Sequence, residues 1–157
     1  MPPMHLRVIE VGQPAPAFEA IDHRGARFSL AEARARGPVV VYFYPRDFTP
    51  GCTREACMFR DAFAELDGLG ATIVGVSVDD DESHRRFAER YQLPFSLVSD
   101  PDHSLAKRFG IRRPLGLGAS RVTFVIDRAG VVRTAIHSEI SMSRHVKETR
   151  AALASLG

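Results

Sequence analysis

The amino-acid sequence predicts an α/β sandwich, in which helices cover both faces of a mixed β-sheet. Two runs of strand length, Val39 to Tyr44 and Ala71 to Val78, are rich in β-branched and apolar residues, which is typical of strands buried on both faces. A segment with helical features follows each run. Near the end of the chain, residues 121–126 and 131–136 alternate in polarity around a turn, which predicts an antiparallel hairpin. This order favours a parallel first half and an antiparallel second half.

The N-terminal part of the chain predicts an extended lead-in followed by a short hairpin. Residues 1–16 contain prolines at positions 2, 3, 14 and 16, and these favour extended backbone. Residues 17–21 and 26–30 predict two short strands that pair across the turn Asp22-His-Arg-Gly25. Ser29 and the alanine-rich run after it predict one helical turn.

The central strand is expected to pass into a helix through a loop that contains two prolines. Pro45 ends the strand, and residues 42–44 are expected in the core. Thr49 predicts the N-cap of the helix, and Pro50 predicts its first residue. The helix is expected to end at glycine 68 or 70. Its apolar stripe lies at positions 56, 59, 63, 66 and 69.

The second half of the chain predicts three more helices around the remaining strands. Residues 79–83 predict the start of a helix whose positions 87, 88 and 91 face inward. Residues 95–98 predict a short strand, and Asp102 or Ser104 predicts the cap of a brief helix that ends at residue 110. Residues 112–120 predict a loop. Ser141 or Ser143 predicts the cap of a last helix that reaches Leu156.

Together these elements predict a thioredoxin-like α/β/α sandwich with a mixed central sheet of about five strands and a short N-terminal hairpin. The sequence contains no internal repeat, low-complexity segment or linker, so we expect a single domain over residues 1–157.

The composition limits the classes of partner. Hydrophobic residues make up 45% and charged residues 25%, the proportions of an ordinary globular protein. The net charge is +2 without a basic block, so no nucleic-acid partner is expected. No segment has 18 uninterrupted apolar residues and the N-terminus lacks the apolar core of a secretory signal, so we expect no membrane partner and a cytoplasmic location.

No cofactor or metal is expected. The six histidines form no metal-binding spacing with either cysteine. The acidic run from Asp79 to Glu82 resembles a cation site, but carboxylates in the first turn of a helix are the better interpretation.

Cys52 is the residue around which a reaction site is predicted. It falls in the first turn of the predicted helix, at the end of the central strand. The free amides and positive end of a helix favour a thiolate over a thiol at this place. A structural interpretation of Cys52, as a small buried apolar side chain, fits its position between Gly51 and Thr53 less well.

A family resemblance follows from the spacing Pro45-x-x-x-Thr49-x-x-Cys52 and from Arg121, which opens a strand of sequence Arg-Val-Thr-Phe-Val-Ile-Asp. The pattern resembles the active-site motif of peroxiredoxins. The wording Tyr-Phe-Tyr-Pro before Arg46, Thr-Pro-Gly-Cys-Thr around Cys52 and a second cysteine at position 57 are similar to the peroxiredoxin Q, or bacterioferritin comigratory protein, subfamily. The loop at 112–120 departs from the family pattern.

The resemblance implies a thiol-dependent peroxidase. It implies that Cys52 is the peroxidatic cysteine, that Cys57 resolves its sulfenic acid as an intramolecular disulfide, and that Thr49, Arg121 and Pro45 support the site. Hydrogen peroxide and organic hydroperoxides would be reduced to water or alcohols, and thioredoxin or another dithiol would restore the thiols. The expected assembly is a monomer or a weak homodimer.

The chemistry requires more than an ionised sulfur. Full ionisation of a free thiol near pH 7 gains only about thirtyfold, and a less basic thiolate is also a poorer nucleophile. The remaining acceleration must come from groups that orient the peroxide and stabilise charge on the leaving oxygen. The candidate donors are the Thr49 hydroxyl, the amides of Gly51 and Cys52, and the Arg121 guanidinium.

The spacing of the two cysteines predicts a conformational change. Five residues along a helix separate two α-carbons by about 8–9 Å, whereas a disulfide requires less than about 7 Å. We therefore expect the start of the helix to unwind on oxidation, and expect Gly51 and the polar segment Thr53-Arg54-Glu55 to make that unwinding easy.

Two other functions fit the same fold. A disulfide oxidoreductase is disfavoured because the chain has no Cys-x-x-Cys. A redox sensor or holdase would use the cysteine pair as a switch without turnover. Structural alternatives also remain for single residues: Cys57 as a core residue, Thr49 as an N-cap alone, and Arg121 as a surface charge.

Overall fold

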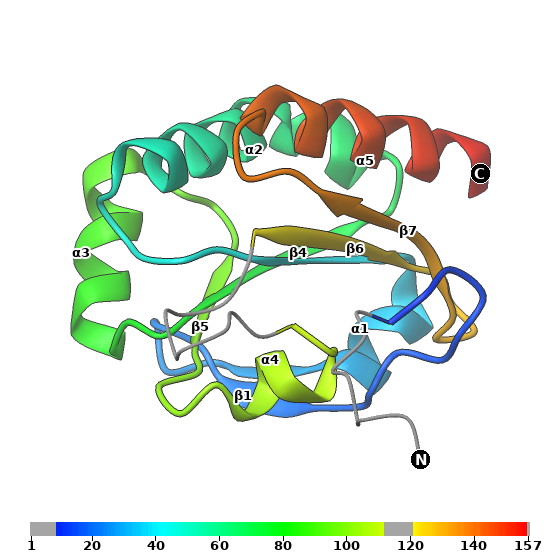
Figure 1. Cartoon of the computed structure of the whole chain (residues 1–157), viewed down its shortest axis with the longest axis horizontal. Coiled ribbons are helices and arrows are strands. Elements are labelled where there is room, and N and C mark those ends of the chain that lie inside the picture. The colour runs from blue at the N-terminus through cyan, green and yellow to red at the C-terminus, as the bar shows by residue number, and fades with distance from the viewer. Residues whose placement is uncertain (1–8, 112–120, 157) are drawn as a thin grey trace, which may run out of the picture.

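A computed structural model describes residues 9–111 and 121–156 of the chain. A five-stranded sheet forms its centre, with strands in the order β5-β4-β3-β6-β7 and layers on both faces (Figure 1). The sheet strands are β3 (Val39–Phe43), β4 (Thr72–Ser77), β5 (Ser96–Ser99), β6 (Val122–Ile126) and β7 (Val132–His137). A separate hairpin pairs β1 (Glu19–Ile21) with β2 (Arg27–Ser29). The helices are α1 (Leu30–Arg36), α2 (Pro50–Gly68), α3 (Asp81–Tyr91), α4 (Ser104–Arg108) and α5 (Met142–Leu156).

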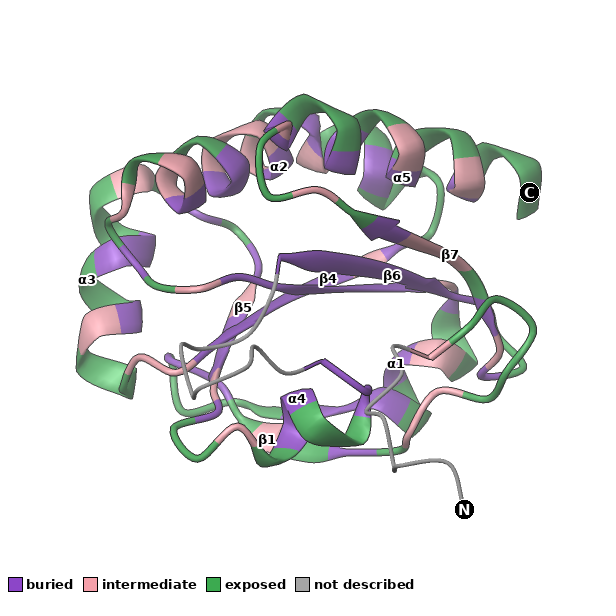
Figure 2. Cartoon of the chain, viewed as in Figure 1, coloured by how far each residue is buried: buried purple, intermediate pink, exposed green. Residues whose placement is uncertain are grey.

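The sheet is mixed, as the sequence predicts. β3 pairs in parallel with β4, and β4 with β5, while β6 and β7 add antiparallel. All five residues of β3 and all five of β6 are buried, which explains their continuous apolar sequence (Figure 2).

Two apolar cores lie on opposite faces of the sheet. Alternate residues of β3 point to opposite faces, so Val40 and Tyr42 belong to the core under α2, α3 and α5, while Val41 and Phe43 belong to the other core. The second core includes residues of the β1–β2 hairpin, α1 and α4. The residues at 42–44 are buried, which confirms their predicted core positions.

Most predicted boundaries agree with the structure to within two residues. Residue 141 precedes α5, and its Oγ accepts a hydrogen bond from the Arg144 amide at 3.3 Å, which confirms Ser141 as the cap. The predicted cap of α4 is wrong: His103, with a left-handed φ of 61°, occupies the N-cap position. A histidine at such a position has no distinctive sequence signal.

The predicted loop at 112–120 lies outside the described residues. No described helix is long and apolar enough to cross a bilayer.

The strand pairing places two distant parts of the chain at one edge of the site. Phe43, the last residue of β3, is paired with Val122, the first residue of the antiparallel β6. Arg121 therefore stands beside the point where the chain leaves β3 for the loop to α2. The parallel β4 ends at the same edge, because Phe43 is also paired with Val76.

Candidate active site

Cys52 lies in the first turn of α2, as the sequence predicts. It is 1% exposed and has a free thiol. The Thr53 amide donates to the Thr49 carbonyl at 2.9 Å, so Thr49 is the N-cap and Pro50 the first helical residue. Because α2 begins directly after the loop from β3, the sulfur lies at the end of the central strand.

Thr49 is the N-cap by position, but its side chain caps no amide. Its hydroxyl donates instead to the Arg46 carbonyl at 3.0 Å. The predicted N-cap position of Thr49 is therefore confirmed, although the loop offers its hydroxyl a carbonyl acceptor and the side chain caps no helix amide. The Gly51 amide, at the second helical position, thus donates no hydrogen bond to the Thr49 side chain.

Arg121 reaches the sulfur from the neighbouring strand. Its Nη1 donates to Cys52 Sγ at 3.4 Å and to Glu55 Oε1 at 2.7 Å, and the residue is 6% exposed. Burial lowers the pKa of Arg121, but the adjacent Glu55 and Cys52 favour the guanidinium and leave the pKa above its ordinary value. The alternative of a surface charge is therefore wrong.

Gly51 allows this approach of the guanidinium. A Cβ at Gly51 would lie 3.1 Å from Arg121 Nη2 and 3.8 Å from Cε of Met142. A Cβ at this position would require the guanidinium to shift by a few tenths of an ångström.

The other two predicted site residues lie nearby in sequence. Pro45 is partly buried and opens the loop between β3 and α2. Cys57 is partly buried on α2 with a free thiol. Both cysteines belong to one continuous helix, so their α-carbons are separated by about 8–9 Å.

Glu55 is a site residue that the sequence analysis missed. It belongs to the polar segment Thr53-Arg54-Glu55, but its side chain is fully buried against Arg121. Burial raises its pKa to about 7, and the pairing with Arg121 offsets only part of that effect, while Glu139 adds to it. Its position three residues after Cys52, on the same helix face, is the sequence signal that could have identified it.

His145 extends this buried group from α5. Its Nδ1 is 2.8 Å from Thr123 Oγ1 and 3.6 Å from Glu55 Oε2, and its Nε2 is 2.8 Å from the Ser138 carbonyl oxygen. The residue is fully buried, and burial lowers its pKa.

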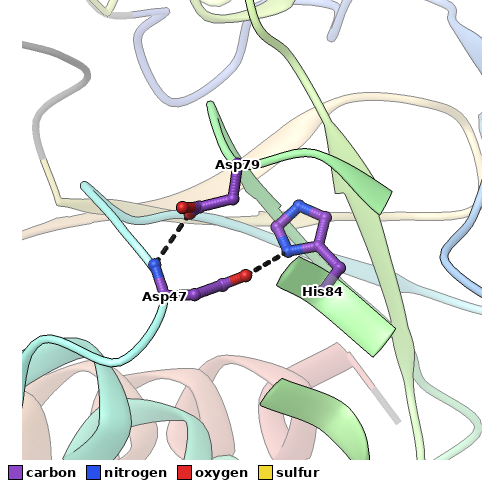
Figure 3. Close-up of side chains that lie close together, drawn as sticks. All are labelled: Asp47, Asp79 and His84. Carbon is purple, nitrogen blue, oxygen red and sulfur yellow. Dashed lines mark hydrogen bonds and ion pairs between the residues drawn. The ribbon is translucent and has the colours of Figure 1, made fainter. Parts of the chain in front are cut away.

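A second polar group fixes the loop that leads to Cys52 (Figure 3). The Asp47 carboxylate accepts from the Tyr44 hydroxyl at 2.6 Å and from Ser83 Oγ at 2.9 Å, and it contacts His84 Nδ1 at 2.7 Å. The Asp47 amide donates to Asp79 Oδ2 at 2.7 Å. These contacts connect the loop to the end of β4 and the start of α3.

Asp47, Asp79 and His84 lie close enough together to suggest a metal site. Both oxygens of Asp47 already accept hydrogen bonds, and Asp79 Oδ2 also accepts from Ser77 Oγ at 2.6 Å. Asp79 precedes α3, whose N-cap is Asp80, so the predicted place of Asp79 in the first turn is wrong. These hydrogen bonds favour a hydrogen-bonded clamp over a metal site.

Phe48 has an unusual backbone next to this clamp. Its φ is 65°, a left-handed value that is unfavourable for a bulky residue. Its ring packs edge-on against Phe87 with centroids 5.1 Å apart, although 47% of the residue is exposed. The clamp and this ring contact hold the loop in a conformation that it would not adopt alone.

Most of the chain is similar to known proteins. A family model described as AhpC/TSA family matches residues 11–135. Peroxiredoxin Q, chloroplastic, from Populus jackii is 42% identical over 149 residues, which cover 94% of this chain and 70% of the relative.

Solved structures show the same fold. Peroxidoxin BcpB from Mycobacterium tuberculosis superposes with a TM-score of 0.88 and 38% identity over 95% of this chain and 99% of that chain. The bacterioferritin comigratory protein of Xanthomonas campestris, whose structure concerns alkyl peroxide reduction activity, has a TM-score of 0.79 and 34% identity over 88% of this chain and 91% of that chain.

Proposed function

The chain belongs to the AhpC/TSA family and to its peroxiredoxin Q group, and from this we propose which of its residues carry the reaction of a thiol-dependent peroxidase. The proposal depends on one observation above all, the 3.4 Å contact between Arg121 Nη1 and Cys52 Sγ. A guanidinium at this distance stabilises a thiolate and lies beside any oxygen that the sulfur attacks.

We assign nucleophilic attack to Cys52. Its thiolate attacks one peroxide oxygen, the O–O bond breaks, and the sulfur becomes a sulfenic acid while the second oxygen leaves and takes up a proton as water or an alcohol. Arg121 and the amide of Gly51 are the donors for the developing oxyanion. Pro45 fixes the loop above the site and keeps water away from it.

The role of Thr49 differs from the one predicted by sequence. Its hydroxyl proton is engaged by the Arg46 carbonyl, so its oxygen is left to accept a hydrogen bond. We propose that it accepts from the peroxide O–H. This contact aims the O–O bond, whereas Arg121 supplies the positive charge.

Cys57 completes the cycle. Its thiolate attacks the Cys52 sulfenic sulfur, the S–O bond breaks, the hydroxide leaves and takes up a proton as water, and an intramolecular disulfide remains. Thioredoxin or a similar dithiol then reduces the disulfide.

We propose hydrogen peroxide and organic hydroperoxides as substrates, the latter because the Xanthomonas relative is described by its alkyl peroxide reduction. A single domain over 1–157, a cytoplasmic location, and a monomer or weak homodimer stay predictions.

A coupled assay tests the assignment. Peroxide-dependent oxidation of reduced thioredoxin should be lost in Cys52→Ser. Cys57→Ser should react with one equivalent of peroxide and then require an external thiol. Full turnover with thioredoxin in Cys57→Ser would refute the resolving role, and turnover in Cys52→Ser would refute the proposal. Insulin reduction without peroxide would indicate a disulfide oxidoreductase, and stoichiometric oxidation alone would indicate a sensor.

A further inference from the structure

We propose that the proton lost by the Cys52 thiol is held by Glu55, because the two acids share one buried guanidinium. The inference rests on the proposed role of Cys52 as nucleophile and extends it to a residue outside the motif. Glu55 is three positions after Cys52 on the same face of α2. Both side chains contact the same atom, Arg121 Nη1, at 2.7 Å from Glu55 Oε1 and 3.4 Å from Cys52 Sγ.

The single positive charge of Arg121 favours one anion, and not two, in the buried site that it shares with Cys52 and Glu55. Among the described residues, Arg121 is the cation that contacts Glu55, and all three groups are buried. A thiolate and a carboxylate together would leave a net negative charge out of water, which is costly. With the proton on Glu55, the guanidinium is fully available to the sulfur.

The hydrogen bonds of Glu55 agree with a neutral carboxyl. Oε1 accepts from Arg121, but Oε2 is buried and has no hydrogen-bond partner within the described part of the chain. A carboxylate oxygen left without a donor is unfavourable in the interior, whereas a protonated oxygen carries less charge. The elevated pKa of Glu55, about 7, is consistent with this geometry.

His145, the nearest nitrogen to Oε2, does not act as a second cation. Its Nε2 faces the Ser138 carbonyl at 2.8 Å, and a carbonyl only accepts, so Nε2 carries a proton. Burial lowers the His145 pKa and so favours the neutral ring, in which Nδ1 accepts from the Thr123 hydroxyl. At 3.6 Å from Oε2, this neutral Nδ1 makes no hydrogen bond to Glu55 and supplies no positive charge to it.

The remaining groups that face Glu55 act in the same direction. Tyr42 on β3 is fully buried, and burial, together with the charge of Glu55, raises the pKa of Tyr42, so that it stays neutral. Glu139, before α5, raises the pKa of Glu55. Neither group supplies a positive charge that would stabilise a second anion beside Cys52.

The proton balance of the cycle is complete. Ionisation converts Cys52–SH and Glu55–COO⁻ into Cys52–S⁻ and Glu55–COOH. Attack on the peroxide then gives a neutral Cys52–SOH and a departing alkoxide or hydroxide. Once the sulfur is neutral, Glu55 ionises again and keeps its ion pair with Arg121. The proton it releases balances the one taken up by the leaving oxygen.

Infrared titration of the reduced protein without peroxide tests the inference. A protonated carboxyl has its own C=O stretching band, and the band that disappears in Glu55→Gln belongs to Glu55. With the thiolate beside it, this band should persist to a pH about one unit higher in the parent than in Cys52→Ser. The matched control Glu65→Gln removes an exposed glutamate of the same helix and should leave the band unchanged.

Two results would overturn the inference. One is a Glu55 band that is lost at the same pH in the parent and in Cys52→Ser. The other is no Glu55 band at any pH in the folded range, which would make Glu55 a permanent carboxylate that only positions Arg121. If Glu55→Gln does not fold, the Glu55 band is identified as the protonated-carboxyl band that remains near pH 7, where ordinary carboxyls are ionised, and the comparison of the parent with Cys52→Ser remains decisive. Failure of the nucleophile assignment would appear separately, as peroxidase turnover in Cys52→Ser.

Discussion

Arg121 Nη1 contacts Cys52 Sγ although the two residues are 69 positions apart in the chain. The contact depends on the pairing of β3 with the antiparallel β6, which brings the start of β6 to the end of β3. The guanidinium is thus positioned by β6, which begins directly after Arg121. The sulfur is positioned by α2, which begins after β3 at the same edge of the sheet.

Replacing Arg121 by lysine should slow the reaction with peroxide by about 100-fold or more, which is the usual effect of removing one donor from a site that stabilises an oxyanion. A lysine ammonium cannot contact the sulfur and Glu55 with the planar geometry of a guanidinium. Stopped-flow measurement of the second-order rate constant checks this. Arg133→Lys, on β7 and paired with Asp127, is the control, and a loss in Arg121→Lys no larger than in this control would contradict the assignment.

Oxidation should unwind the start of α2. The two cysteines belong to one helix and cannot bond until at least part of residues 52–57 leaves it. Burial of Glu55 against Arg121 adds a contact that must break, so unwinding costs more than the sequence suggested. Amide exchange should show lost protection over residues 50–60 in the disulfide form but not in oxidised Cys57→Ser. Unchanged protection with the bond formed would refute the prediction.

The Asp47 clamp should be important for stability. Asp47→Asn replaces one acceptor oxygen of a buried carboxylate that binds Tyr44, Ser83 and His84. We expect the free energy of unfolding to fall by about 2–4 kcal/mol, as for other broken buried networks. Urea unfolding measures it, with Asp61→Asn on the exposed face of α2 as the control. Equal midpoints for the two variants would show that the clamp is dispensable.

Glu55 should also make stability depend on pH. Its pKa is about 7 in the folded protein and near 4.5 in the unfolded chain, so the folded protein binds more protons between these values. Its stabilising contribution is therefore complete below about pH 4.5 and is lost as the pH rises through about 7. The loss is about 3 kcal/mol.

Urea unfolding of the parent and Glu55→Gln at a series of pH values isolates this effect. The lowered pKa of His145 acts in the opposite direction, but it is common to both proteins. The difference between their unfolding free energies should change over this range and level off above it. A constant difference would mean that Glu55 has an ordinary pKa.

The sequence predicted the strands of the mixed sheet, its parallel and antiparallel parts and the place of Cys52, because these depend on local patterns, namely apolar runs, prolines and helix caps. It did not predict Glu55, since a glutamate beside an arginine in a polar segment is normally exposed. Nor did it predict the pairing of Asp47 with His84, which are 37 positions apart. These side chains meet only after the helices pack on the sheet, so no short motif records them.

Arg121 directly precedes strand β6, whereas Cys52 belongs to helix α2, and this difference has a consequence for each catalytic cycle. If the helix start unravels to join the two sulfurs, the strand and its arginine keep their place in the sheet. Reduction then leaves one short segment to rewind against a surface that never moved. The enzyme would return to its reactive form by refolding of the start of α2 against an unchanged sheet. The rate of this step would depend on that short segment alone.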